Sequence, residues 1–209
     1  MNFLLGSPVA DEETKDFFRK IIFTNEEILK LKILLYSLKI RALNAQILSA
    51  NSGAFAASYG VVSAEIIHFN HKIQEVNERL TNAINIVIKM ASEMQKIVKV
   101  YHLLQIAVET CNQRKVDPSH YKNIESSLRY RNEEKKMLEL QLRKEFNAIH
   151  NLVKSSTKLC LEGRTVSLQT RIESATIVEN QKLFLAVSES FDGALNIIES
   201  SYRYLAKLW

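Results

Sequence analysis

Apolar residues recur through the middle of this chain in alternating steps of four and three. A repeat of about 3.5 residues held over many turns is typical of a helix in a coiled coil, whereas strands alternate with a period of two. The pattern therefore predicts one long helix over residues 55–113. Its apolar series is Val62, Ile66, Phe69, Ile73, Val76, Leu80, Ala83, Val87, Met90, Met94, Ile97, Tyr101, Leu104, Val108 and Cys111.

Three further segments carry helical spacing. Upstream, two apolar registers run side by side and predict a helix over residues 10–50 with a wide apolar face, as in a helix bundle. The first register is Leu29, Ile33, Tyr36, Ile40, Leu43, Ile47 and Ala50, and the second is Ile28, Leu31, Leu35, Leu38, Ala42 and Ala45. Downstream, helices over 119–160 and 166–208 are predicted from Leu138, Leu142, Ile149 and Leu152 and from Phe184, Val187, Phe191, Ala194, Ile198, Tyr202 and Leu205.

Turn signals separate these four segments. Asn51-Ser52-Gly53 follows the first helix, and we expect Gly53 to take a left-handed conformation there. Asp117-Pro118-Ser119 follows the second helix, with Pro118 suited to the first turn of the third. Glu162-Gly163-Arg164-Thr165 is predicted to close the third helix, with Thr165 capping the fourth.

These elements predict an all-α fold, an elongated antiparallel coiled coil or four-long-helix bundle. The second helix would be about 85 Å long at a rise of 1.5 Å per residue. Residues 1–116 would form one helical hairpin and residues 117–209 a second that packs on it in one bundle. A third helix that ended at 160 would be shorter than the second, so we expect the first turn to lack a partner within the chain.

Composition narrows the functional classes. Only 5 Gly and 2 Pro occur in 209 residues, too few for a many-turned β fold. Lys and Arg number 28 against 23 Asp and Glu, and the two signs interleave, so we expect no nucleic-acid partner. The uncharged stretch from Ala42 to Ala64 contains many Asn, Gln and Ser, so we expect no stable membrane insertion and a cytoplasmic location.

No constellation of catalytic or ligand-binding residues stands out. Glycine-rich phosphate loops, nucleophile elbows and metalloprotease motifs are absent from the sequence. Cys111 and Cys160 lack neighbouring acid–base partners, and His68 with His71 lacks a further metal ligand nearby. We therefore expect no enzymatic activity, no cofactor and no metal.

The segment that spans the first turn, residues 40–69, carries the strongest functional signal. It reads IRALNAQILSANSGAFAASYGVVSAEIIHF, with small residues such as Ala54 and Ala56 that let two helices approach closely. It resembles, without a gap, the cytoplasmic signalling tip of bacterial chemoreceptors, the methyl-accepting chemotaxis proteins, which has the form ILALNAA-EAARAGE-GRGFAVVA-EVR-LA. The matching residues are Ala42-Leu43-Asn44-Ala45, Ala50, Gly53, Tyr59, Val61-Val62 and Glu65.

The resemblance implies two protein-binding surfaces. Tyr36, Ile40 and Leu43 fall on apolar positions where the family's dimers join into trimers. In that family a glutamate and an arginine near the turn also belong to these contacts. Leu48 and Asn51 stand in their places here.

The second implied surface lies beyond the turn. Val61 and Glu65 fall where the family docks its coupling protein and the receptor-binding domain of its histidine kinase, and we expect Asn44 to join them from across the hairpin. Val61 and Glu65 are four residues apart and share one helix face. Val62 belongs to the apolar series, so we expect Val61 to be exposed and Val62 buried.

The sequence thus predicts a non-enzymatic signal-transduction protein similar to a soluble chemoreceptor signalling domain. Its expected partners are a chemotaxis coupling protein, a histidine kinase or chemoreceptor tips. The second hairpin could complete the bundle within one chain, or two chains could form a homodimer. A helical pore-forming or secreted coiled-coil protein and a plain structural scaffold remain as alternatives.

Overall fold

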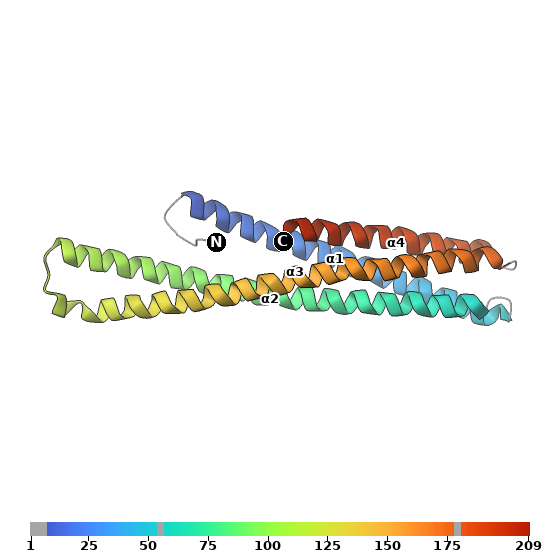
Figure 1. Cartoon of the computed structure of the whole chain (residues 1–209), viewed down its shortest axis with the longest axis horizontal. Coiled ribbons are helices and arrows are strands. Elements are labelled where there is room, and N and C mark those ends of the chain that lie inside the picture. The colour runs from blue at the N-terminus through green and yellow to red at the C-terminus, as the bar shows by residue number, and fades with distance from the viewer. Residues whose placement is uncertain (1–7, 54–56, 178–180) are drawn as a thin grey trace. The chain divides into compact units, whose positions relative to one another are not determined.

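The fold is all-α, with four long helices packed antiparallel (Figure 1). The computed structural model describes residues 8–53, 57–177 and 181–209. The helices are α1 (Pro8–Asn51), α2 (Ala57–Gln113), α3 (Lys122–Thr176) and α4 (Gln181–Leu208), and a short 3-10 helix, η2 (Pro118–His120), precedes α3. The neighbouring pairs are α1 with α2, α2 with α3, α3 with α4, and α1 with α4, which confirms the predicted four-helix fold.

Two compact units make up the chain. One comprises residues 1–22 and 83–148, and the other comprises residues 23–82 and 149–209. Each unit therefore includes residues of both predicted hairpins, 1–116 and 117–209, rather than one hairpin each. The tip segment 40–69 belongs to the second unit, called the tip unit below.

Most of the apolar series of α2 and only one of the two registers of α1 lie in the core; in α2 the last four residues of the series, from Tyr101 onward, are only partly buried. Ile66, Ile73 and Leu80 of the α2 series are wholly buried, as predicted. In α1 the second register is buried, with Leu31 wholly inaccessible, whereas the first register faces outward, with Tyr36 70% exposed. A helix with two neighbours buries the stripe that faces them, so the wide apolar face of α1 is divided between core and surface.

The predicted break at Glu162–Thr165 is wrong, because α3 continues through it to Thr176. Gly163 is buried in mid-helix, where an added Cβ would lie 2.6 Å from the Phe69 ring and 2.8 Å from Leu195. The glycine thus allows close helix packing and is not a stop signal. Thr165 consequently lies inside α3 and caps no helix.

The longer α3 brings the second hairpin level with the tip, so the expectation that the first turn lacks a partner is also wrong. Ile177 packs in one buried cluster with Ala45, Tyr59 and Phe184. The Tyr59 and Phe184 rings lie 4.4 Å apart, and the Tyr59 hydroxyl donates a hydrogen bond to the Phe184 carbonyl oxygen at 3.0 Å. Residues after the α3 helix therefore cover the tip core from within the same chain.

Residues at the turns themselves account for the two connections that join the first three helices. Gly53 has φ of +70°, which confirms its predicted left-handed conformation. Asp117 caps η2, since its carboxylate accepts a hydrogen bond from the Ser119 amide at 2.9 Å. Pro118 begins η2 and not α3. The small residues Ala54 and Ala56 lie outside the described residues.

The two hairpins of the tip unit bury equivalent positions at a constant separation of 125 residues, the separation of Tyr59 from Phe184. Every buried residue of α1 from Thr24 to Ser49 has a buried counterpart in α3. The same holds between Tyr59–Leu80 of α2 and α4, except that the counterpart of Val62 is only partly buried. Identical pairs are few; they are Leu34/Leu159, Leu43/Leu168, Ile47/Ile172, Ser49/Ser174, Ala50/Ala175, Val62/Val187, Ser63/Ser188, Ile73/Ile198 and Leu80/Leu205.

Counterparts also contact each other, as residues near the axis of a twofold-symmetric dimer do. Tyr59 contacts its counterpart Phe184, and the Tyr202 hydroxyl donates a hydrogen bond to its counterpart Asn77 at 2.7 Å. The tip unit is thus a pseudo-twofold pair of hairpins within one chain. This is the arrangement expected if the second hairpin completes the bundle.

Candidate functional site: the outer face of α1 and its grooves

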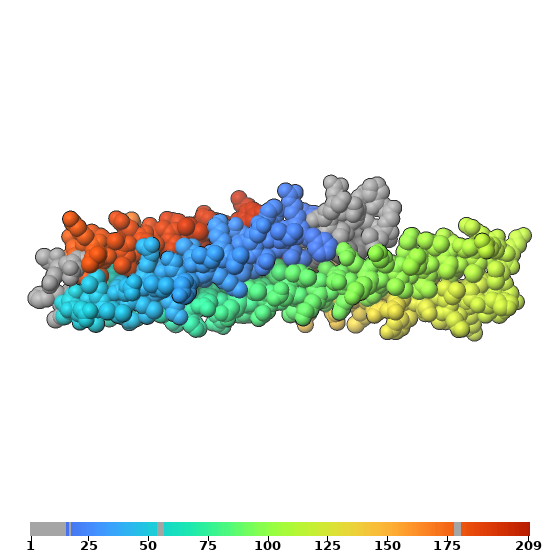
Figure 2. All heavy atoms as spheres, turned by 180° about the vertical axis from the view of Figure 1, so that it is seen from behind, coloured from blue at the N-terminus to red at the C-terminus, as the bar shows by residue number. Residues whose placement is uncertain are grey.

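The outer face of α1 carries a continuous series of large exposed apolar side chains. Ile33 is 67% exposed and Tyr36 is 70% exposed. α1 lies at the surface between α2 and α4 (Figure 2). We call this face the α1 seam. It consists of Leu29, Ile33, Tyr36, Ile40, Leu43 and Ile47, all of which are exposed.

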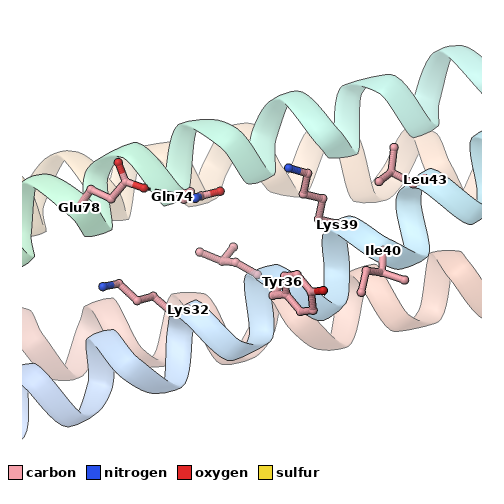
Figure 3. A pocket seen from close by; sticks show the side chains of 8 residues that line it. Lys32, Tyr36, Lys39, Ile40, Leu43, Gln74 and Glu78 are labelled. Atoms are coloured by element: carbon pink, nitrogen blue, oxygen red, sulfur yellow. Dashed lines mark hydrogen bonds between the residues drawn. The ribbon is translucent and has the colours of Figure 1, made fainter.

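A groove of about 460 Å³ runs between the α1 seam and α2 (Figure 3). Tyr36 and Ile40 line its α1 side, and Lys39 extends from α1 toward α2. We call it the α1–α2 groove. Its remaining lining residues are Lys32, Leu35, Leu43, Gln74 and Glu78.

Positive charge flanks the α1 seam. From Ile28 to Asn51 the chain carries four basic residues and no acidic one. Lys30 pairs with Glu27 at 3.3 Å. Among the described residues, no carboxylate forms an ion pair with the other three basic residues of this stretch, Lys32, Lys39 and Arg41.

Val61 and Val62 differ as the apolar spacing requires. Val61 is 66% exposed, whereas Val62 is 7% exposed and lies in the core. Glu65, one turn beyond Val61, lines a groove between α2 and α3 near Lys72 and Glu162. Lys72 and Glu162 form an ion pair across this groove at 2.9 Å.

Five of the six predicted partner-binding residues line grooves, and these are three different grooves; the sixth, Val61, is exposed one turn from Glu65. Tyr36, Ile40 and Leu43 line the α1–α2 groove. Glu65, with Val61 one turn away, belongs to the α2–α3 groove. Asn44 instead lines a groove between α1 and α4, beside Leu183 and Val187. Asn44 therefore does not join the Val61–Glu65 surface from across the first hairpin.

An ion-pair cluster that the sequence did not single out joins α3 to α4. Arg164 donates hydrogen bonds at 2.6 Å to Asn196 and to Glu199, and its guanidinium lies 3.4 Å from Asp192. The hydrogen bond from Arg164 lowers the pKa of Glu199. Asp192, Asn196 and Glu199 follow one another in steps of four and three, so a polar stripe on one helix face was the available signal.

The described side chains form no His, Cys, Asp and Glu cluster able to hold a metal ion. No three of their His, Cys, Asp or Glu residues come together, and both His68 and His71 are exposed. Burial raises the pKa of the Cys160 thiol to about 11, which keeps it protonated near neutral pH. No described helix combines the length and apolarity needed to cross a bilayer.

No protein-family model, curated protein or solved structure matches this chain. Exposed aromatic and aliphatic side chains gathered on one face are typical of protein-binding patches. The α1 seam and the Val61–Glu65 surface are therefore the two candidate contact sites.

Proposed function

We propose that this chain is a non-enzymatic signal-transduction protein, a soluble relative of the chemoreceptor signalling hairpin. It acts by docking to components of a chemotaxis array: a coupling protein, the receptor-binding domain of a histidine kinase, or chemoreceptor tips. The exposure of Val61 beside the buried Val62 is the observation that carries the proposal. It leaves an apolar side chain at a position where the resembled family makes its docking contact.

The outward direction of the α1 seam also supports docking. Tyr36, Ile40 and Leu43 line an open groove, whereas a plain four-helix scaffold has no need of large apolar side chains there. The pseudo-twofold pairing of hairpins supports the same proposal. It supplies, within one chain, the four-helix frame that a receptor tip obtains by dimerisation.

A pull-down with a purified chemotaxis coupling protein and a kinase receptor-binding domain tests the proposal. Val61→Arg places a charge in the proposed contact, so we expect it to reduce binding at least about tenfold. Val61 is exposed, so the thermal unfolding midpoint should stay within a few degrees of the wild type.

Ile172→Arg is the matched control, because Ile172 is also an exposed β-branched residue, 63% accessible, but lies on α3. This variant should bind as the wild type does. Equal binding by folded Val61→Arg and wild type would exclude the Val61 surface from the function. Failure of the wild-type chain to bind any of these partners would favour a structural scaffold.

A further inference from the structure

We propose that the α1–α2 groove binds an amphipathic helix of a partner protein whose apolar seam is flanked by carboxylates. This inference rests on the proposed function, because it defines the partner chemistry of one of the two candidate docking surfaces. It follows from the spacing of the α1 seam, from comparison of the two hairpins, and from the charge of α1.

The spacing of the α1 seam suits a helix as its occupant. Leu29, Ile33, Tyr36, Ile40, Leu43 and Ile47 follow one another in steps of four and three. This is the spacing of the a and d positions of a coiled coil, where each side chain inserts between residues of a facing helix. In α1 the register that faces α2 and α4 has the same spacing, so the helix carries one seam for its own bundle and a second directed outward.

Comparison with the second hairpin shows that carboxylates are missing from the α2 side of the groove. The counterpart of Lys39, 125 residues later, is Arg164, which contacts Asp192, Asn196 and Glu199 on α4. The positions on α2 that correspond to these three are Ile67, His71 and Gln74. A basic side chain is thus kept on α1, while both carboxylates that balance it on α4 are absent from α2.

A partner helix with glutamate or aspartate beside its apolar seam would supply those carboxylates. Lys32 and Lys39 both line the groove, and among the described residues neither forms an ion pair. The carboxylate of Glu78 also lines it, so the groove carries two positive groups and one negative group. Complementary charges would direct both the choice of partner and the register of the two helices.

The same charges argue against a second copy of this chain as occupant. Pairing two α1 seams would bring lysines together, since no acidic residue lies between Ile28 and Asn51. Like charges beside a helical seam disfavour association. An anionic membrane would satisfy the lysines, but a flat bilayer surface cannot follow a concave groove lined by two helices.

Two synthetic peptides test the inference against the full-length chain. Each has about four heptads with Ile and Leu at a and d, and each remains monomeric through like-charge repulsion at e and g. One carries Glu at e and g, and the other carries Lys. By fluorescence anisotropy at low salt, we expect the Glu peptide to bind at least about tenfold more tightly than the Lys peptide, with the difference shrinking in high salt.

Charge reversal locates the binding site. Lys32→Glu with Lys39→Glu should invert the preference between the two peptides. The control is Lys154→Glu with Lys158→Glu, which makes the same change in net charge at exposed positions of α3. This control should keep the wild-type preference. All four residues are exposed, so circular dichroism melts should show every variant folded.

Equal binding of the two peptides by the wild type would overturn the inference. So would an inverted peptide preference in the Lys154→Glu with Lys158→Glu control. Concentration-dependent dimerisation abolished by Lys32→Glu with Lys39→Glu, without peptide binding, would make a second copy the occupant. Binding to phosphatidylserine vesicles without peptide binding would make it a membrane. Neither result depends on Val61, so a failure here is distinguishable from a failure of the proposed function.

Discussion

Gly163 and Gly193 lie in two helices of one hairpin, yet a methyl group would have opposite effects at the two positions. Gly163 is buried beneath Phe69 and Leu195, and the Phe69 ring is held in an edge-to-face contact with Phe191, centroids 5.8 Å apart. Gly193 is exposed on α4, and a Cβ there would meet no atom within 4 Å. Space around the residue, and not residue type, determines the consequence.

We predict that Gly163→Ala lowers the free energy of unfolding by about 1–2 kcal/mol, because overpacking outweighs the better helix propensity of alanine. Gly193→Ala should raise it by about 0.5–1 kcal/mol, since only the propensity changes. Urea unfolding followed by circular dichroism measures both changes. Stabilisation by Gly163→Ala would show that Phe69 and Leu195 can move away at little cost.

The two hairpins fill this part of the core with side chains of different size. Small Gly163 corresponds to large Leu38, and large Phe69 corresponds to small Ala194. The summed side-chain volume of Gly163 with Phe69 is therefore close to that of Leu38 with Ala194, although neither residue is the same. Cores tolerate such volume-conserving changes, which explains how equivalent positions stay buried with so few identities.

At the scale of elements, α3 and α4 are joined by the Arg164 cluster, whereas α1 and α2 have no equivalent cluster among the described residues. The Glu199 carboxylate accepts from both Arg164 and Arg203, at 2.6 Å and 2.5 Å. Asp192 accepts from Ser167 at 2.9 Å and lies 3.4 Å from Arg164. One guanidinium thus organises a polar stripe along nearly two turns of α4.

We expect Arg164→Ala to lower the free energy of unfolding by about 1–2 kcal/mol, because it removes several charge-assisted hydrogen bonds at once. Arg171→Ala is the control, since Arg171 is more exposed and its nitrogen lies 4.0 Å from Asp192. Its loss should cost less than about 0.5 kcal/mol. Urea titrations at low and high salt give both values, and equal costs would show that the cluster adds nothing beyond single surface pairs.

For the molecule as a whole, the main consequence is that one chain completes the four-helix core of the tip unit. Tyr59 with Phe184 and Asn77 with Tyr202 pair across the pseudo-twofold axis, where a dimer would pair identical residues. Within residues 23–82 and 149–209, the second hairpin thus occupies the place that a partner hairpin would take in a dimer.

We predict that the thermal unfolding midpoint is independent of protein concentration over about a hundredfold range. An obligate dimer becomes more stable as its protomer concentration rises, whereas a monomer does not. Differential scanning calorimetry at several concentrations makes the measurement, with sedimentation equilibrium reporting mass. A midpoint that rises steadily with concentration would indicate that a second chain contributes to the core.

Sequence pattern predicted the helical class, the course of α2 and the turn at Gly53, because these depend on local properties. A 3.5-residue apolar repeat identifies a helix in isolation, and a glycine after a helix is suited to positive φ whatever surrounds it. The exposure of Val61 and the burial of Val62 followed from the same spacing. The pattern failed at Gly163, since a glycine that ends a helix and one that admits a neighbouring ring look identical in sequence.

What the sequence determined by itself was therefore the set of elements and the positions able to enter a core. Only the tertiary structure decided which register of α1 is buried, because both registers are apolar and burial depends on where α2 and α4 lie. It also decided that the hairpins pair with pseudo-twofold symmetry, a relation carried by burial and volume at a separation of 125 residues and not by residue identity. Burial is a property of neighbours distant in the chain, which a local pattern does not encode.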